Sequence, residues 1–275
     1  MIGIFDSGIG GLTVVRELER LSPGTPFAYL GDTARTPYGN KSAETVVRYA
    51  LEDAAFLMEK GADAIVIACN SASAVATDAL RVAHPGLPVF EVIAPAAEDA
   101  LAATKGVVGV IGTRATIASG AYERRIVGPK VRVIAQACPL FVPLVEEGWL
   151  EDAETKRIAR RYLSPLRQAQ VDTLILGCTH YPLIAPIIHR YMGNRVTLID
   201  SAESVVRRVL EHGAWNMKHG AHEDEGRRTQ DEVRGTRYEV RRTNQFYLTD
   251  LSKRSEDIAR AWLGHPVTFE QADLA

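Results

Sequence analysis

The chain has 275 residues, 46% of them hydrophobic, which is enough for one large core or two smaller ones. Its formal net charge of −2 is not that of a protein that binds nucleic acid or an anionic membrane, so a small-molecule partner is expected. The N-terminal MIGIFDSGIGG lacks the features of a signal peptide, and no apolar run could span a bilayer, so we expect a cytoplasmic protein.

Short apolar runs alternate with longer amphipathic stretches along most of the chain. The runs are unbroken, as in strands that are buried on both faces of a sheet. They are Ile2–Asp6, Phe27–Leu30, Ala64–Cys69, Val89–Ile93, Val107–Gly112, Val131–Ala135, Thr173–Cys178 and Val196–Asp200. The stretches Leu12–Leu21, Ser42–Lys60 and Thr155–Gln170 have helical periodicity. This alternation predicts an α/β fold with parallel sheets.

The expected strands repeat as a set of four, at offsets of 104 to 109 residues. The best-matched pair is ADAIVIACNS at residues 62–71 and VDTLILGCTH at residues 171–180. We therefore expect two pseudo-symmetric α/β domains, each a parallel-type sheet flanked by helices, with the active site between them. Residues 1–95 and 208–275 would form the first domain, and residues 96–207 the second.

The composition changes after Gly213. The charged stretch Gly220–Gly235 predicts a solvated loop. Beyond it, Tyr238–Leu248 predicts a strand or hairpin and Ser252–Leu263 a final helix, which we expect to return to the first half of the chain.

Polar residues cluster where the expected strands end, and ligands of open α/β sheets bind at that edge. The candidate site residues in these clusters are Asp6, Ser7, Tyr38, Gly39, Cys69, Asn70, Ser71, Thr113, Thr116, Cys178, Thr179 and His180. The hydroxyl and amide side chains, with backbone N–H groups at helix starts, suit the binding of carboxylates. They are equally good helix caps, and both roles can hold at once.

Cys69 and Cys178 occupy matching positions in the repeat, each followed by two polar residues. Inverting a stereocentre by proton transfer needs a base on one face and an acid on the other, which two thiols can supply. A helix start after each cysteine is expected to lower its thiol pKa, with Asp6 and His180 tuning the two thiols further. A lone cysteine at a strand end is more often a small buried hydrophobe, and we interpret Cys138 in that way.

The sequence predicts no cofactor and no metal. Thr13 stands where the third glycine of a dinucleotide-binding G-x-G-x-x-G would be. No strand-end cluster contains a lysine suited to a pyridoxal-phosphate Schiff base, because Lys41 is expected to begin an exposed helix. The seven histidines have no metal-ligand spacing.

The clusters resemble the signature motifs of glutamate racemases, within the aspartate/glutamate racemase superfamily. The matching segments, which run in family order from Phe5 to Leu183, are FDSGIGGLTV, GDTARTPYG, ACNSASA, IGTRATI, CPLFVPLVEEG and GCTHYPL. Ser71 departs from the family, which usually has threonine there, but it keeps the hydroxyl group.

The resemblance implies a cofactor-independent isomerase that interconverts L-glutamate and D-glutamate and supplies D-glutamate for peptidoglycan. It implies that Cys69 and Cys178 are catalytic, and that a supporting glutamate is Glu146 or Glu147, of which we favour Glu146. It also implies substrate contacts from Asp6, Ser7, Tyr38, Gly39, Asn70, Ser71, Thr179 and His180. Members of the family are often dimers, so a homodimer is a further expectation.

Two other functions fit the sequence. An aspartate or hydantoin racemase of the same superfamily would use the same two-thiol chemistry. A non-catalytic, two-lobed binding protein would also hold a small molecule between two α/β halves.

Overall fold

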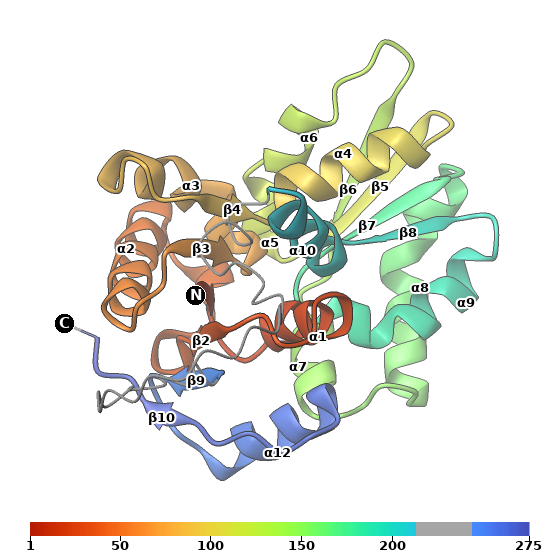
Figure 1. The fold of residues 1–275 in the computed structure, drawn as a ribbon. Coiled ribbons are helices and arrows are strands. Elements are labelled where there is room, and N and C mark those ends of the chain that lie inside the picture. The colour runs from red at the N-terminus through yellow and green to blue at the C-terminus, as the bar shows by residue number, and fades with distance from the viewer. Residues whose placement is uncertain (213–243, 275) are drawn as a thin grey trace, which may run out of the picture.

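The computed structural model describes residues 1–212 and 244–274, in which strands and helices alternate (Figure 1). The strands are β1 (Ile2–Asp6), β2 (Phe27–Gly31), β3 (Ala64–Ile67), β4 (Val89–Glu91), β5 (Val107–Gly112), β6 (Arg132–Ala137), β7 (Thr173–Gly177), β8 (Thr197–Asp200), β9 (Gln245–Leu248) and β10 (Glu270–Gln271). The α-helices are α1 (Leu12–Leu21), α2 (Ala43–Glu59), α3 (Asn70–Ala83), α4 (Ile93–Ala103), α5 (Arg114–Ala118), α6 (Ala121–Arg125), α7 (Phe141–Glu146), α8 (Ala153–Gln168), α9 (Ala185–Met192), α10 (Ser201–Glu211) and α12 (Lys253–Leu263). Three 3-10 turns are η1 (Thr33–Arg35), η2 (Tyr38–Asn40) and η3 (Tyr181–Ile184).

The α/β fold is confirmed, and all eight strands expected before residue 207 are present. Most of their residues are apolar because both faces of the sheets are covered, and every residue of β1, β2, β3 and β7 is buried. Strands β3 and β4 end two residues earlier than expected, because Cys69 caps α3 and Ile93 already begins α4.

The strands form two parallel sheets with the same order in their shared part. One has the order β10-β9-β2-β1-β3-β4 and the other the order β6-β5-β7-β8. The segment β2-β1-β3-β4 therefore corresponds strand by strand to β6-β5-β7-β8, with the pairing that the sequence repeat predicted. Cys69 and Cys178 follow the corresponding strands β3 and β7, so they lie at equivalent places in the two sheets.

The end of the chain returns to the first sheet, as expected. Strand β9 pairs in parallel with β2, β10 pairs with β9, and α12 packs on α1 (Figure 1). Only the end of the expected Tyr238–Leu248 strand can be compared, and Gly220–Gly235 lies outside the described residues. The expected domain boundaries, 1–95 with 208–275 and 96–207, remain a prediction.

Candidate active site

A cleft of about 450 Å³ opens where the carboxyl ends of the two sheets face each other. Loops that follow β1, β3, β5 and β7 contribute to its wall, as expected for an open α/β sheet. The expected site residues that line it are Ser7, Tyr38, Gly39, Cys69, Asn70, Ser71, Thr113, Glu146, Cys178, Thr179 and His180. Asp6 and Thr116 are buried behind this wall.

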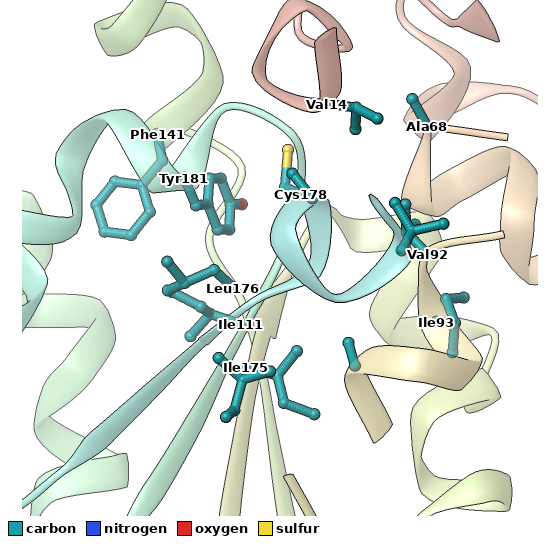
Figure 2. Close-up of a cluster of buried hydrophobic side chains, with 14 of the residues drawn as sticks. Val14, Ala68, Val92, Ile93, Ile111, Phe141, Ile175, Leu176, Cys178 and Tyr181 are labelled. Atoms are coloured by element: carbon teal, nitrogen blue, oxygen red, sulfur yellow. The ribbon is translucent and has the colours of Figure 1, made fainter. Parts of the chain in front are cut away.

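Both candidate thiols open onto this cleft while each side chain is largely covered, at 5% exposure. Cys69 caps helix α3, and its thiol donates to Ser7 Oγ at 3.3 Å. Cys178 follows β7, and its carbonyl accepts the N–H of Tyr181 at the start of η3. Figure 2 shows the Cys178 sulfur projecting away from the buried side chains of Ile111 and Ile175. A packed core thus holds the backbone of Cys178 and leaves its sulfur at the cleft.

Burial raises the pKa of the Cys69 thiol to about 12, and the nearby charge of Asp6 adds to this effect. The Ser7 hydroxyl and the backbone N–H of Ala72 act in the opposite direction but do not outweigh burial. The helix start thus acts on Cys69 in the expected direction, but the expected net fall in its pKa is wrong, because desolvation of the thiolate costs more than the helix start returns. Cys69 is held in its protonated form.

The second thiol has a different environment, since His180 lies beside it. His180 Nδ1 is 3.9 Å from Cys178 Sγ, and its Nε2 is 2.9 Å from Glu146 Oε1. Burial opposes the charged form of His180, but its hydrogen bonds and charge interactions with Cys178 and Glu146 raise the pKa to about 10. Glu147 instead pairs with Arg254 at 2.7 Å, so Glu146 is the glutamate that reaches the site.

Asp6 connects the two sides from behind the wall. Its carboxylate accepts the Gly8 N–H at 3.1 Å and lies 3.5 Å from the hydroxyl of Thr179, beside Cys178. Burial raises the Asp6 pKa, while the charge on His180 lowers it. From behind the cleft wall, Asp6 therefore contacts both the loop after β1 and the loop after β7, and its charge affects the groups that these loops carry.

The loop after β1 approaches the loop after β7 so closely that Gly10 has no room for a side chain. A Cβ at Gly10 would lie 2.2 Å from Thr179 Oγ1 and 2.5 Å from His180 Cε1. The Thr13 hydroxyl, in the first turn of α1, donates to the Thr179 carbonyl at 2.9 Å. Gly10 of the DSGIGG segment thus allows contact between the two halves of the repeat, which is a different role from binding a dinucleotide.

Neutral polar groups that follow strands of both sheets also meet in the wall of the cleft. The Ser71 hydroxyl lies 3.0 Å from that of Thr113 and 3.3 Å from that of Thr116. Asn70 Oδ1 accepts from the hydroxyl of Tyr122 at 2.7 Å, which directs its NH2 group the other way. Thr116 is fully buried, so it supports Ser71 and Thr113 from behind.

The cleft also contains residues that the sequence analysis did not single out. They are Gly8, Thr36, Pro37, Asn40, Arg114, Pro139, Leu140, Val142, Pro143 and Tyr162. Several fall within the recognised segments GDTARTPYG and CPLFVPLVEEG, which were the available signal. Arg114 adds an exposed cation to a lining that was expected to rely on neutral donors. Tyr38 is buried, and its hydroxyl points to a carboxylate cluster instead of the cleft.

Cys138 is fully buried in the hydrophobic core, as expected for a structural cysteine. Within residues 1–212 and 244–274, no group of three or more His, Cys, Asp or Glu side chains is arranged to hold a metal ion. None of the helices described in these ranges is long and apolar enough to cross a membrane.

Comparison with known proteins identifies relatives over most of the chain. The family described as Asp/Glu/Hydantoin racemase matches residues 10–209. The glutamate racemase of Geobacter metallireducens is 53% identical over 213 residues, which cover 76% of this chain and 78% of the relative.

Solved glutamate racemases share the whole fold. An isoform from Bacillus anthracis has a TM-score of 0.85 at 35% identity, covering 100% of this chain and 97% of that chain. The enzyme from Francisella tularensis, solved in complex with D-glutamate, has a TM-score of 0.84 at 33% identity, covering 99% of this chain and 97% of that chain.

The contact between Glu146 and His180 predicts the effect of Glu146→Gln on the histidine. The variant should lower the pKa of His180 from about 10 toward the ordinary value of 6.5, because the amide keeps the shape but removes the charge. The folded-state pKa lies above the unfolded one, so the stabilisation from this charge is full below pH 6.5 and is lost as the pH rises through about 10. Histidine ring shifts in an NMR titration measure the change. Glu147→Gln is the matched control, and an equal shift in both variants would contradict the assignment.

The close approach at Gly10 predicts that Gly10→Ala displaces Thr179 and His180. Overpacking of this kind should cost about 1–3 kcal/mol of stability, measured by chemical denaturation. The NMR signals of the His180 ring should shift as well. Gly24→Ala is the control, because Gly24 has a positive φ of 85° but no atom within 4 Å of an added Cβ. It should lose stability through backbone strain alone, with the His180 signals unchanged.

Proposed function

The chain belongs to the Asp/Glu/hydantoin racemase family, and we propose that it interconverts L-glutamate and D-glutamate without a cofactor. It is therefore an isomerase of the racemase class. The proposed mechanism uses Cys69 and Cys178 as the acid and base on opposite faces of the substrate. The observation that carries this mechanism is that the two thiols follow corresponding strands of two equivalent sheets and line one cleft.

For L-glutamate, the Cys178 thiolate would remove the α-proton, so that the Cα–H bond breaks and an S–H bond forms. The Cys69 thiol would then deliver its proton to the other face, which breaks its S–H bond and forms the new Cα–H bond. D-glutamate would follow the reverse path, with Cys69 as the base. The assignment of each thiol to one enantiomer rests on the family resemblance.

The electrostatics support this direction of proton transfer. The raised pKa of Cys69 keeps that thiol protonated and able to act as the acid. His180, with its raised pKa, holds positive charge beside the sulfur of Cys178, which the proposed mechanism uses as the base. Glu146 would act through His180, as a residue that keeps the histidine charged and oriented.

The remaining lining suits an amino-acid dicarboxylate. Ser7, Asn70, Ser71, Thr113 and Thr179 offer neutral donors around the thiols. Arg114 adds one cation at the wall, where it would attract a negatively charged substrate. Tyr38 and Gly39 would contribute through the surface of their loop, because the Tyr38 hydroxyl is engaged elsewhere.

Glutamate is favoured over aspartate or a hydantoin because the relatives at 33% to 53% identity are glutamate racemases, one of them solved with D-glutamate. We further propose that the chain acts in the cytoplasm on a free small molecule, with neither nucleic acid nor membrane as a partner. Its D-glutamate would serve peptidoglycan synthesis. A homodimer and the division into residues 1–95 with 208–275 and 96–207 are part of the same proposal.

Substrate and cofactor independence can be tested together. After exhaustive dialysis against a chelator and hydroxylamine, the protein should still racemise L-glutamate, followed by circular dichroism. In deuterated water the product should carry deuterium at its α-carbon, and L-aspartate should react far more slowly. Activity that returns only with a metal or pyridoxal phosphate would sink the cofactor-independent mechanism. Glutamate binding without deuterium incorporation would instead favour a non-catalytic binding protein.

The two-thiol mechanism predicts that Cys69→Ser and Cys178→Ser each lower racemisation by about 10²- to 10⁴-fold, because a hydroxyl is a much poorer base than a thiolate. A substrate analogue with a leaving group at the β-carbon separates the faces, since elimination needs only deprotonation. Cys69→Ser should still eliminate from the L-analogue, and Cys178→Ser from the D-analogue.

Cys138→Ser is the matched control and should leave both activities close to the parent values. Near-parental racemisation by Cys69→Ser would refute the mechanism. Elimination from the opposite enantiomer by each variant would keep the two thiols but reverse the assignment of faces.

A further inference from the structure

A cluster of buried and partly buried polar side chains lies behind the wall of the cleft, and the proposed proton transfer does not use it. Its members are Asp32, Arg35, Tyr38 and Asp53, and Thr249 joins it from the segment after β9. Asp32, Tyr38 and Asp53 are each 0% exposed. Buried polar clusters of this kind are stable only when every donor and acceptor is matched, so the positions of the protons matter.

Asp32 accepts three hydrogen bonds. They come from the Tyr38 hydroxyl, from Arg35 Nε at 2.6 Å and from the Thr249 hydroxyl at 2.9 Å. Both side-chain oxygens of Asp32 therefore act as acceptors.

Asp53 is matched differently. Its Oδ1 accepts from Arg35 Nη2 at 2.9 Å, and its Oδ2 lies 2.9 Å from the Tyr38 hydroxyl oxygen. A tyrosine hydroxyl has one hydrogen, so Tyr38 can donate to only one of its two carboxylate neighbours. We place that hydrogen toward Asp32, whose oxygens accept in all their other contacts as well. If Asp53 were ionised, two oxygens with lone pairs would face each other with no hydrogen between them. A proton on Asp53 Oδ2 removes this conflict, because the carboxyl group then donates to Tyr38.

The charges around the cluster agree with that placement. Arg35 is the guanidinium that contacts both aspartates, and it also contacts the carboxylate of Glu52. The Arg35 guanidinium lies 4.1 Å from the centre of the Tyr49 ring. Arg48 contacts Glu52 at 3.9 Å and lies over the same Tyr49 ring at 5.2 Å. With Asp53 ionised, three carboxylates would share one central cation. Burial accordingly raises the pKa of Asp53 well above its ordinary value, and the negative charge of Asp32 raises it further.

We propose that Asp53 is a protonated positioning residue, which donates to Tyr38 so that Tyr38 can donate to Asp32, and that this chain of hydrogen bonds holds the Thr36–Asn40 wall of the cleft. This proposal rests on the proposed function in one respect only, which is that glutamate binds in the cleft. Residues 36–40 all line the cleft, yet η2 within them is a single 3-10 turn. Side-chain hydrogen bonds therefore have to fix the wall, because its own backbone does so weakly.

The same chain connects the wall to the C-terminal part of the protein. Thr249 Oγ1 donates to Asp32 and accepts the N–H of Ala34 at 2.9 Å. Thr33 Oγ1 donates to the Asp250 carbonyl at 2.8 Å and accepts the Asp250 N–H at 2.9 Å. The strand β9 thus delivers two residues that hold η1, which lies directly before the wall.

The proton on Asp53 can be observed without any assay of activity. In the full-length protein at neutral pH, the infrared difference spectrum of parent minus Asp53→Asn should contain the C=O stretch of a protonated carboxyl group, shifted in deuterated water. Parent minus Asp32→Asn should contain a carboxylate band instead. A carboxylate band for Asp53 would overturn the proposal, whether or not glutamate is the substrate.

Kinetics test the positioning role. The amide introduced by Asp53→Asn can still donate its NH2 group to Tyr38, so this variant should keep the KM for glutamate within about threefold of the parent. The amide of Asp32→Asn would present either its NH2 group or an uncharged oxygen to Tyr38 and Arg35, which both donate to Asp32 in the parent. The wall should then be held less well, so the KM for glutamate should rise about tenfold or more while kcat changes less. That rise corresponds to about 1.4 kcal/mol of binding free energy.

Asp53→Leu should resemble Asp32→Asn in KM, because it removes the donor. If that variant does not fold, the infrared spectrum still tests the proton on Asp53, and the KM values of Asp53→Asn and Asp32→Asn still test the positioning role. Equal KM values for Asp53→Asn and Asp32→Asn would contradict the positioning role. Failure of glutamate racemisation in the parent protein would count against the proposed function alone, since the infrared result and the Tm of each variant remain readable.

Discussion

The close contact between the loop after β1 and the loop after β7 is the constraint on which the site depends. Gly10 leaves no space for a Cβ beside Thr179 and His180, and Thr13 donates to the Thr179 carbonyl across the same boundary. These contacts fix the separation of two sheets whose strand orders correspond. Because Cys69 and Cys178 follow corresponding strands, fixing the sheets also fixes where the two thiols open onto the cleft. A side chain at Gly10 would change that spacing directly.

The geometric equivalence of the thiols does not extend to their electrostatics. Cys69 lies in a buried environment with Asp6 nearby, and its pKa is raised to about 12. Cys178 lies next to His180. The contact between His180 and Glu146 helps to keep the histidine charged. One thiol is thus held as an acid and the other beside a cation. In the proposed mechanism, the corresponding strands would place one thiol on each face of the substrate, and the two thiols would differ in their electrostatic surroundings.

The wall of the cleft depends on residues far from the thiols in the sequence. The loop that contains Tyr38 lines the cleft, but the Tyr38 hydroxyl contacts Asp32 and Asp53. The return of the chain through β9 adds Thr249 to the same cluster. Extending the first sheet by β9 and β10 therefore does more than add buried area, because it brings a hydrogen-bond donor to the carboxylate that anchors the wall. The second sheet has no strand that corresponds to β9 within the described residues.

The sequence alone determined the α/β fold, the eight strands up to residue 207, their internal repeat and the pair Cys69 and Cys178. Period, strand ends and repeated spacing are local properties, so one chain reveals them. It could not determine that Asp6 and Thr116 lie behind the wall, that Glu146 contacts His180 while Glu147 contacts Arg254, or that Tyr38 turns its hydroxyl away from the cleft. The expected fall in the pKa of Cys69 was wrong for the same reason. Desolvation and hydrogen-bond partners depend on which distant segments cover a side chain, and only the tertiary structure decides that.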